Sequence, residues 1–199
     1  MKYAFVNGKL LDGTQDMKVR EGLVVLTDGE KIRDIVPAGS DLTGYTQVDL
    51  QGGYLMPGLI NMHVHLAGNG KPQKKQRDNE KLVSRIMSTP LTRAVAYRMV
   101  SDFARTELLS GVTTIRTVGG LGSFDTRLRD EIAAGKKEGP RILAANQGIS
   151  VPGGHMAGSV AIAAKNIEEA LAQLAESEKE KVDLIKLMIT GGVLDAKEK

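Results

Sequence analysis

The order of hydrophobic and polar residues predicts two architectures along the chain. Within the first 50 residues, short apolar runs are separated by turn dipeptides, of which Asn7-Gly8 and Asp28-Gly29 are the clearest. Such dipeptides favour the positive φ angles of two-residue hairpins. The runs are residues 3–6, 23–27 and 31–36. We therefore predict a small β-domain over residues 1–56, with a turn at each dipeptide, and a second domain over residues 57–199.

Beyond residue 56, apolar runs alternate with helical patterns. The runs predict strands at residues 57–66, 112–120, 140–146 and 182–190. A segment long enough for a helix separates each run from the next, and no hairpin signal joins any two of them. This order favours a parallel sheet with right-handed crossovers, which places the chain in the α/β class.

Three of the intervening helices are predicted with a side that packs on the sheet. Thr89 and Pro90 mark the start of the first, and Asn166 with Glu169 marks the start of the third as a capping-box variant. Apolar residues at helical spacing predict the packing side. They are Leu91, Val95, Met99 and Phe103 in the first helix, Leu128 and Ile132 in the second, and Ala170, Leu171 and Leu174 in the third.

Composition and charge exclude several classes of protein. The 199 residues are 41% hydrophobic and 26% charged, with a net charge of +3, which is ordinary for a soluble globular protein. Aromatic residues make up only 4% and no nucleic-acid-binding motif is present, so no nucleic-acid partner is expected. The chain begins without a signal-peptide core and contains no apolar run of membrane-spanning length, so we expect no membrane association and a cytoplasmic location. The basic stretch 71–77 is interpreted as a solvated loop, with binding of phosphate or an acidic substrate as the alternative.

Candidate metal chemistry begins with two histidines in the strand predicted at residues 57–66. His63 and His65 are two residues apart, so an extended strand presents both imidazoles on one face, where they could bind one metal ion. The alternative is a pair of strand histidines without a metal. Because the chain has no cysteine, any zinc would need nitrogen and oxygen ligands.

Lys186 lies inside the apolar strand predicted at residues 182–190, where an ammonium group without a partner is costly to bury. It could extend to the end of the strand or pair with a carboxylate. Alternatively, a desolvated lysine has a lowered pKa and can react with carbon dioxide to give a carbamate. The two carbamate oxygens could bridge two divalent cations.

Three stretches resemble the amidohydrolase superfamily. Residues 57–65 (PGLINMHVH) are similar to its PGLID-x-H-x-H signature, with Asn61 in place of the usual aspartate. Residues 185–193 resemble the strand that bears the carboxylated lysine in prolidase-like members, and residues 151–158 resemble their Gly-Gly-His loop. The second predicted barrel strand has Arg116-Thr117 where the family often has Arg-Asp, which puts an acidic role there in doubt. The resemblance implies the first half of a (β/α)8 TIM barrel, preceded by part of a small urease-like β-sandwich domain.

The resemblance also implies an activity. In a binuclear metal-dependent amidohydrolase, His63 and His65 would bind one of two divalent metals, with zinc expected, and carboxylated Lys186 would bridge both. A hydroxide between the metals would attack an amide carbonyl of a dipeptide or N-acyl amino acid. His155 would bind substrate, or would make only a local hydrogen bond. The alternatives are a cyclic-amide hydrolase of the imidazolonepropionase or dihydroorotase kind, and a non-catalytic half-barrel that serves as an assembly subunit.

The sequence stops after the fourth of eight expected barrel strands. We therefore expect a complementary chain that carries strands five to eight, together with the general-base aspartate and the remaining metal-binding histidines. The completed enzyme is expected to form a homo-oligomer. The charged end, residues 195–199, is interpreted as an exposed loop.

Overall fold

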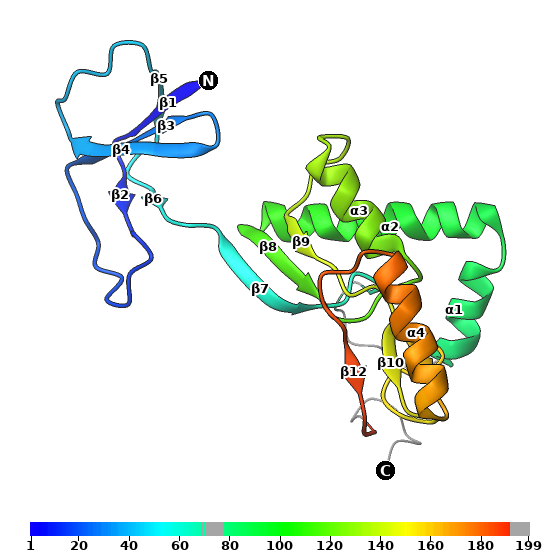
Figure 1. Ribbon diagram of the computed structural model, residues 1–199. Coiled ribbons are helices and arrows are strands. Elements are labelled where there is room, and N and C mark those ends of the chain that lie inside the picture. Colours follow the sequence, from blue (N-terminus) through cyan, green and yellow to red (C-terminus); the bar gives the residue numbers. More distant parts are fainter. Residues whose placement is uncertain (69, 71–77, 192–199) are drawn as a thin grey trace. The chain divides into compact units, whose positions relative to one another are not determined.

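The computed structural model describes residues 1–68, 70 and 78–191 and divides into two compact units, Met1–Pro57 and Gly58–Lys199 (Figure 1). The basic stretch 71–77 and the end predicted at residues 195–199 lie outside the described residues. The strands of the first unit are β1 (Lys2–Val6), β2 (Lys9–Leu10), β3 (Leu23–Asp28), β4 (Lys31–Pro37), β5 (Thr46–Asp49) and β6 (Tyr54–Leu55).

The first unit is built on a four-stranded sheet in the order β4-β3-β1-β5, with a separate pair of strands, β2 and β6. The predicted hairpin at Asp28-Gly29 is confirmed, because Asp28 pairs with Lys31 across the turn and Gly29 has a φ of 59°. The hairpin predicted at Asn7-Gly8 is wrong. Asn7 does turn the chain with a φ of 55°, but β1 then pairs with β5 and β2 with β6, both in parallel. These partners come from distant sequence, which a turn dipeptide does not specify.

The strands of the second unit form two parallel sheets. One has the order β7-β8-β9 and the other β11-β10-β12. Their bounds are β7 (Leu59–Val64), β8 (Val112–Thr117), β9 (Arg141–Leu143), β10 (Gly148–Ser150), β11 (Ala161–Ala163) and β12 (Leu187–Met188). All four predicted strands are therefore present, although each is shorter than predicted.

A bend at Asn146 separates the two sheets. The third predicted strand, residues 140–146, ends at Leu143, and strand structure resumes with β10. Asn146 has a φ of 55°, a left-handed conformation that asparagine tolerates better than most residues. The fourth strand, β12, then pairs with β10 rather than with β9.

The described helices are α1 (Asn79–Met87), α2 (Pro90–Leu109), α3 (Phe124–Ala133) and α4 (Ile167–Lys179). Two of them, α2 and α4, begin where their capping residues predicted, whereas α1 was not predicted. The Thr89 side chain accepts the N–H of Thr92 at the start of α2, and the Asn166 side chain accepts the N–H of Glu169 at 2.8 Å at the start of α4. Each cap satisfies a backbone donor that has no partner within its helix.

Helices α2 and α3 cover one face of the β7-β8-β9 sheet (Figure 1). Leu128 of α3 is fully buried and Ile132 packs against the same core, as predicted. The side predicted for α2 is wrong for Leu91, Val95 and Met99, of which Leu91 is 76% exposed, whereas Phe103 packs against the core as predicted. The buried side of α2 instead has smaller or planar residues, which let the helix approach the sheet closely. They are Ala96, Tyr97, Val100 and Ala104.

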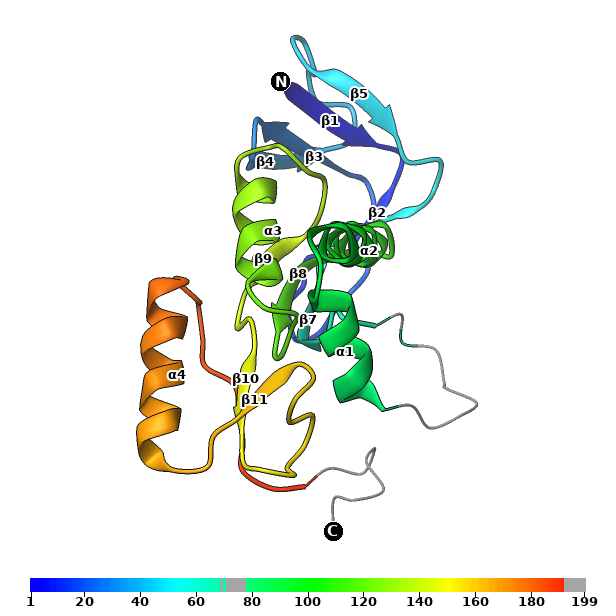
Figure 2. The same cartoon turned by 90° about the vertical axis from the view of Figure 1, so that its right-hand side faces the viewer.

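The side predicted for α4 is also wrong. Leu171 is 57% exposed, Leu174 is exposed as well, and Ser177 is the buried residue of this helix. Helix α4 lies on the opposite side of β10 and β11 from α1 (Figure 2), and the part of the chain that the structure describes does not cover its apolar row. Helix α4 has an amphipathic pattern, but the described residues provide no surface against which its apolar residues pack.

Candidate metal centre

The two strand histidines lie together at the carboxyl end of β7. The Nε2 atoms of His63 and His65 are 3.3 Å apart, and the Nδ1 atom of His65 lies 3.1 Å from the carbonyl oxygen of Gly119. A carbonyl oxygen can only accept, so Nδ1 of His65 carries the proton in this contact. The Nε2 atom is then the one that presents a lone pair, as a metal ligand requires.

The separation of the two nitrogens matches the geometry of a metal site. Two nitrogens bound to one tetrahedral zinc, each at about 2.0–2.1 Å, lie roughly 3.3 Å apart. The observed 3.3 Å between the Nε2 atoms of His63 and His65 is this value. The separation of the donor atoms therefore fits a single divalent cation.

The surroundings of His65 favour its neutral form. Burial lowers the pKa of His65 below 6.5, and positive charge on His63, Lys186 and His155 lowers it further, while the Gly119 carbonyl acts in the opposite direction. A neutral imidazole is the form that binds a metal. The same interactions indicate that all four basic side chains gather in one region.

Lys186 reaches this region from the start of β12. Its carbonyl oxygen accepts the N–H of Ile149 at 2.9 Å, which ties it to β10, and its side chain is half-buried. The strand itself begins one residue later, at Leu187. Gly148 makes room for the lysine, because a Cβ at that position would lie 3.2 Å from the Cγ of Lys186.

His155 lies in the loop that follows β10, at the same edge of the sheet as the ends of the other strands. Its backbone is fixed at both ends, since its N–H donates to the Thr190 carbonyl at 3.1 Å and its carbonyl accepts the Ser150 hydroxyl at 3.1 Å. Its charge contributes to the lowered pKa of His65, so it lies within electrostatic reach of the two strand histidines. Its role in binding substrate stays a prediction.

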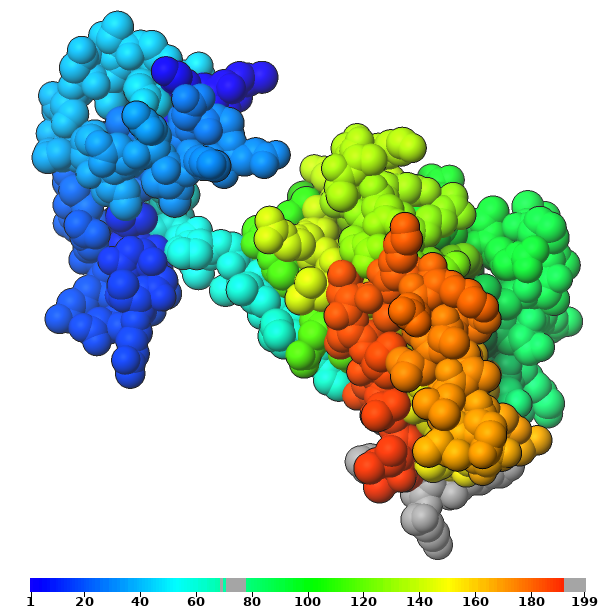
Figure 3. All heavy atoms as spheres, in the orientation of Figure 1, coloured from blue at the N-terminus to red at the C-terminus, as the bar shows by residue number. Residues whose placement is uncertain are grey.

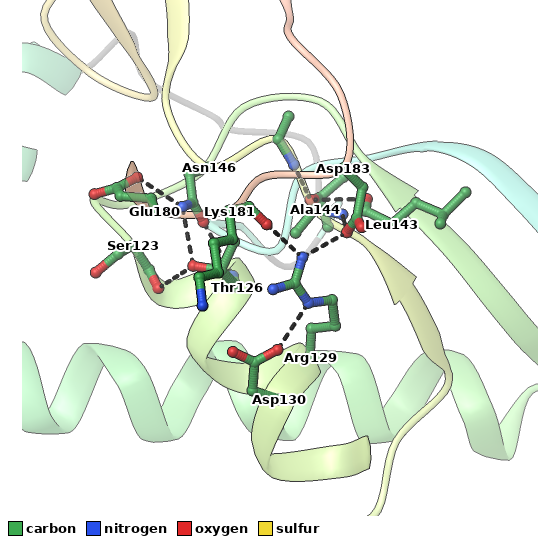
Figure 4. Close-up of polar contacts among 12 residues, drawn as sticks. Ser123, Thr126, Arg129, Asp130, Leu143, Ala144, Asn146, Glu180, Lys181 and Asp183 are labelled. Carbon is green, nitrogen blue, oxygen red and sulfur yellow. Dashed lines mark hydrogen bonds and ion pairs between the residues drawn. The ribbon is translucent and has the colours of Figure 1, made fainter. Parts of the chain in front are cut away.

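Two polar residues that the sequence analysis did not single out connect the segment after β9 to the segment that leads into β12 (Figure 4). The Asp183 carboxylate accepts the N–H of Ala144 and a guanidinium N–H of Arg129, both at 2.8 Å. The backbone N–H of Asp183 donates to the carbonyl of Ala144, also at 2.8 Å. This double contact fixes the chain three residues before Lys186.

Asn146 forms the second contact of this kind (Figure 4). Its side-chain oxygen accepts the N–H of Thr126, and its amide nitrogen donates to the Thr126 hydroxyl, both at 3.0 Å. The same nitrogen donates to Glu180 at 2.7 Å. The bend between β9 and β10 is thereby joined to the start of α3 and to the segment that leads into β12. The sequence gives no signal for this role, because the burial and the positive φ of Asn146 become visible only in the structure.

A buried carboxyl group lies behind the loop that carries Gly119. Asp125 of α3 is 1% exposed. Its Oδ2 atom has no hydrogen-bond partner among the described residues, although the Thr117 hydroxyl forms a hydrogen bond with the carboxyl group. A Cβ on Gly120 would lie 2.5 Å from that Oδ2 atom, so glycine is required there. Burial raises the pKa of Asp125 from 3.8 to about 6, and the Thr117 hydrogen bond opposes the shift.

Asp125 should make the free energy of unfolding depend on pH. Because its pKa is higher in the folded state, the folded chain binds more protons between pH 4 and 6, and stability falls as pH rises through this window. The expected loss is about 3 kcal/mol between pH 4 and pH 7. Urea unfolding should show this loss in the wild type and not in Asp125→Asn. The exposed Asp102→Asn on α2 serves as the control, and a wild-type slope retained in Asp125→Asn would contradict the assignment.

No cluster of three or more histidine, cysteine, aspartate or glutamate side chains suited to a metal occurs among the described residues. The histidine pair with Lys186 stays the candidate centre that the sequence predicted. Comparison with known proteins shows the family of the chain. The model of the amidohydrolase family matches residues 54–197, which is most of the chain. The chain belongs to the amidohydrolase family.

Individual relatives agree with this assignment. The chain is 33% identical over 150 residues to an imidazolonepropionase from Stenotrophomonas maltophilia, covering 66% of this chain and 37% of that protein. A putative prolidase from Bifidobacterium longum superposes with a TM-score of 0.74 at 31% identity, covering 99% of this chain and 43% of that one. A Xaa-Pro dipeptidase with methionine bound in its active site gives a TM-score of 0.75 at 29% identity, with 97% and 48% covered.

The chain of this amidohydrolase spans less than half the length of each of these relatives. The predicted fold is confirmed as the first half of a TIM barrel preceded by part of a small β-domain, with prolidases among its structural neighbours. None of the helices that the structure describes is long and apolar enough to cross a membrane.

Proposed function

We propose that this chain supplies half of the active site of a binuclear metal-dependent amidohydrolase. The observation that carries the proposal is the 3.3 Å separation of the His63 and His65 Nε2 atoms, together with the contact between His65 Nδ1 and Gly119 that leaves the Nε2 lone pair available. A hydrogen bond between the two Nε2 atoms would need one of them to hold a proton. A divalent cation would remove that requirement and use both lone pairs.

Lys186 is proposed as the ligand shared by two metals, in its carboxylated form. The four side chains gathered here are basic, and an ammonium group among them would repel a divalent cation. Reaction of Lys186 with carbon dioxide removes the positive charge of its ammonium group. The neutral amine nitrogen bonds to the carbon of carbon dioxide, one N–H proton leaves to solvent, and the product is an anionic carbamate with two oxygen donors. The two hydrogen bonds between Asp183 and Ala144 hold the backbone that precedes Lys186.

Bound divalent metals would supply a water of lowered pKa and would polarise the substrate carbonyl. The residues of this chain have complementary tasks in the proposal. His63 and His65 orient the cation, and the Gly119 carbonyl fixes the tautomer of His65. His155, from the loop after β10, is proposed to contact the substrate. The general-base aspartate is expected from the part of the barrel that this chain does not contain.

The substrate is proposed to be a dipeptide or an N-acyl amino acid that is cleaved at its amide bond. The support is the likeness to a putative prolidase and a Xaa-Pro dipeptidase over almost the whole of this chain. A second candidate is the ring opening of a cyclic amide. The match to an imidazolonepropionase favours it, and a shorter match to a dihydroorotase from Wolbachia does so as well, at 33% identity over 75 residues.

We also propose that the remaining barrel strands pack on the edges of this unit formed by β7 and β12. Among the described strands, β7 pairs only with β8 and β12 only with β10. Both edge strands carry exposed apolar side chains, since Ile60 of β7 is 63% exposed and Leu187 of β12 is 60% exposed. Figure 3 shows α4 and the segment that ends in β12 lying against each other. A groove of about 400 Å³ lies between them and is lined by Leu174, Glu178, Val182, Asp183, Leu184 and Ile185.

Native mass spectrometry with metal analysis of the same sample tests the proposal. We expect the protein to carry about two divalent metals per completed barrel, and a complementary polypeptide to accompany this chain. Xaa-Pro dipeptides, N-acyl amino acids and cyclic amides should then be compared as substrates, with the chain alone and with its complement. A completed barrel without metal would contradict the metallohydrolase assignment. Metal without any amide hydrolysis would favour the assembly-subunit alternative.

A further inference from the structure

The strand that carries the two histidines is not regular. Asn61 pairs with Ile115 and Val64 pairs with Thr117, so two residues of β7, Met62 and His63, lie opposite a single residue of β8. This is a β-bulge, in which one strand contains an extra residue relative to its partner. The bulge lies at His63 itself.

The bulge decides which face the histidines occupy. Ile115 and Thr117 lie on the same face of β8 because they are two residues apart, whereas Asn61 and Val64 would lie on opposite faces of a regular strand. The extra residue lets Val64 enter the core beneath the helices, so that His63 and His65 face the other way. In a regular continuation of the Asn61 pairing, His63 would lie opposite Thr117 and face the helices.

Two side chains satisfy the backbone groups that the bulge displaces. The Arg116 Nε–H donates to the Met62 carbonyl at 2.7 Å, a short, charge-assisted hydrogen bond from the residue directly opposite the bulge. The side-chain oxygen of Asn61 accepts the N–H of His63 at 3.2 Å. Without these contacts the carbonyl and the N–H would have no partner in the strand ladder.

We propose that Arg116 and Asn61 are positioning residues that hold this bulge and thereby set the direction of His63 and His65. The inference rests on the proposed metal site for its functional consequence. Arg116 acts through the backbone of β7 rather than on the cation, because its contact is with the carbonyl that precedes His63. Asn61 occupies the position of the aspartate in the family signature and still provides the accepting oxygen.

Zinc titration of the complete protein gives the first test. Arg116→Met should weaken zinc binding roughly 10-fold to 100-fold, as is usual when a group that orients a metal ligand is removed. Arg116→Lys should recover part of the affinity if its amine reaches the Met62 carbonyl. Arg141→Met is the matched control, because Arg141 pairs with Thr114 two residues before Arg116, on the same face of the sheet but away from the bulge. It should change the affinity by less than about twofold.

Amide hydrogen exchange of the metal-free protein gives a second test that needs no metal. Arg116→Met should accelerate exchange of the His63 N–H by roughly tenfold or more, with little change in β9 and α3. Asn61→Ala should accelerate the same N–H directly. If wild-type protein bound no zinc, the proposed function would fail, and the exchange pattern would still decide the role of Arg116. Unchanged exchange at His63, or acceleration spread evenly over the unit with wild-type zinc affinity, would overturn the inference.

Discussion

Replacement of Lys186 by alanine is expected to lower kcat/KM by about 10³-fold or more and to reduce the metal content from two ions to one or none. The reason is the loss of the shared anionic ligand among side chains that are otherwise basic, a setting in which two cations would repel each other. The measurement is metal analysis and amide hydrolysis by the completed enzyme. Lys165→Ala, an exposed lysine in the loop before α4, is the control and should leave both values unchanged.

A rescue experiment separates carboxylation from a simple structural role of Lys186. A short carboxylic acid added to Lys186→Ala provides two oxygens of the same charge as a carbamate, so it should restore part of the metal content and activity. Removal of carbon dioxide during metal loading should lower the metal content of the wild type. If Lys186→Ala retained two metals and full activity without any additive, the shared-ligand role would be wrong.

Replacement of either strand histidine by alanine is expected to have an effect of similar size. His65→Ala removes the ligand whose tautomer is fixed by Gly119, and His63→Ala removes its partner at 3.3 Å, so each should reduce kcat/KM by about 10³-fold through loss of the cation. Zinc analysis and kinetics of the completed enzyme measure this directly.

His155→Ala provides the matched histidine control for these variants. Because His155 is proposed to contact the substrate, its loss should raise KM and leave the metal content at the wild-type value. Loss of metal in His155→Ala would move this residue into the ligand set. Full metal content in His65→Ala would remove His65 from it.

The pH behaviour of the histidine site follows from the lowered pKa of His65. Since burial and neighbouring positive charge lower the pKa of this ring, protons compete less with the metal for its Nε2 atom than they would for an exposed histidine. Burial thus has different consequences for His65 and Asp125. It keeps His65 neutral as a ligand, and it makes the carboxylate of Asp125 a source of instability as pH rises.

Local sequence patterns predicted the elements because each depends on residues close together in the chain. The caps at Thr89 and Asn166 form within one helical turn, and the Asp28-Gly29 hairpin closes between adjacent strands. The pair His63 and His65 is local in the same sense, and its two rings do lie together. Which side of α2 and α4 is buried was predicted wrongly, since that depends on which surface lies opposite each helix.

By itself, the sequence determined the α/β class, four strands of the second unit, the starts of α2 and α4 and the candidate ligands His63, His65 and Lys186, because residue type and short-range spacing specify these. It did not predict β10, β11 or α1. The tertiary structure alone decided the rest. These features are the bulge opposite Arg116, the bend at Asn146 and the hydrogen bond from the Ala144 N–H to the Asp183 carboxylate. Each of these is a contact between segments distant in the chain, and a hydrogen bond of that kind has no periodicity from which a sequence can predict it.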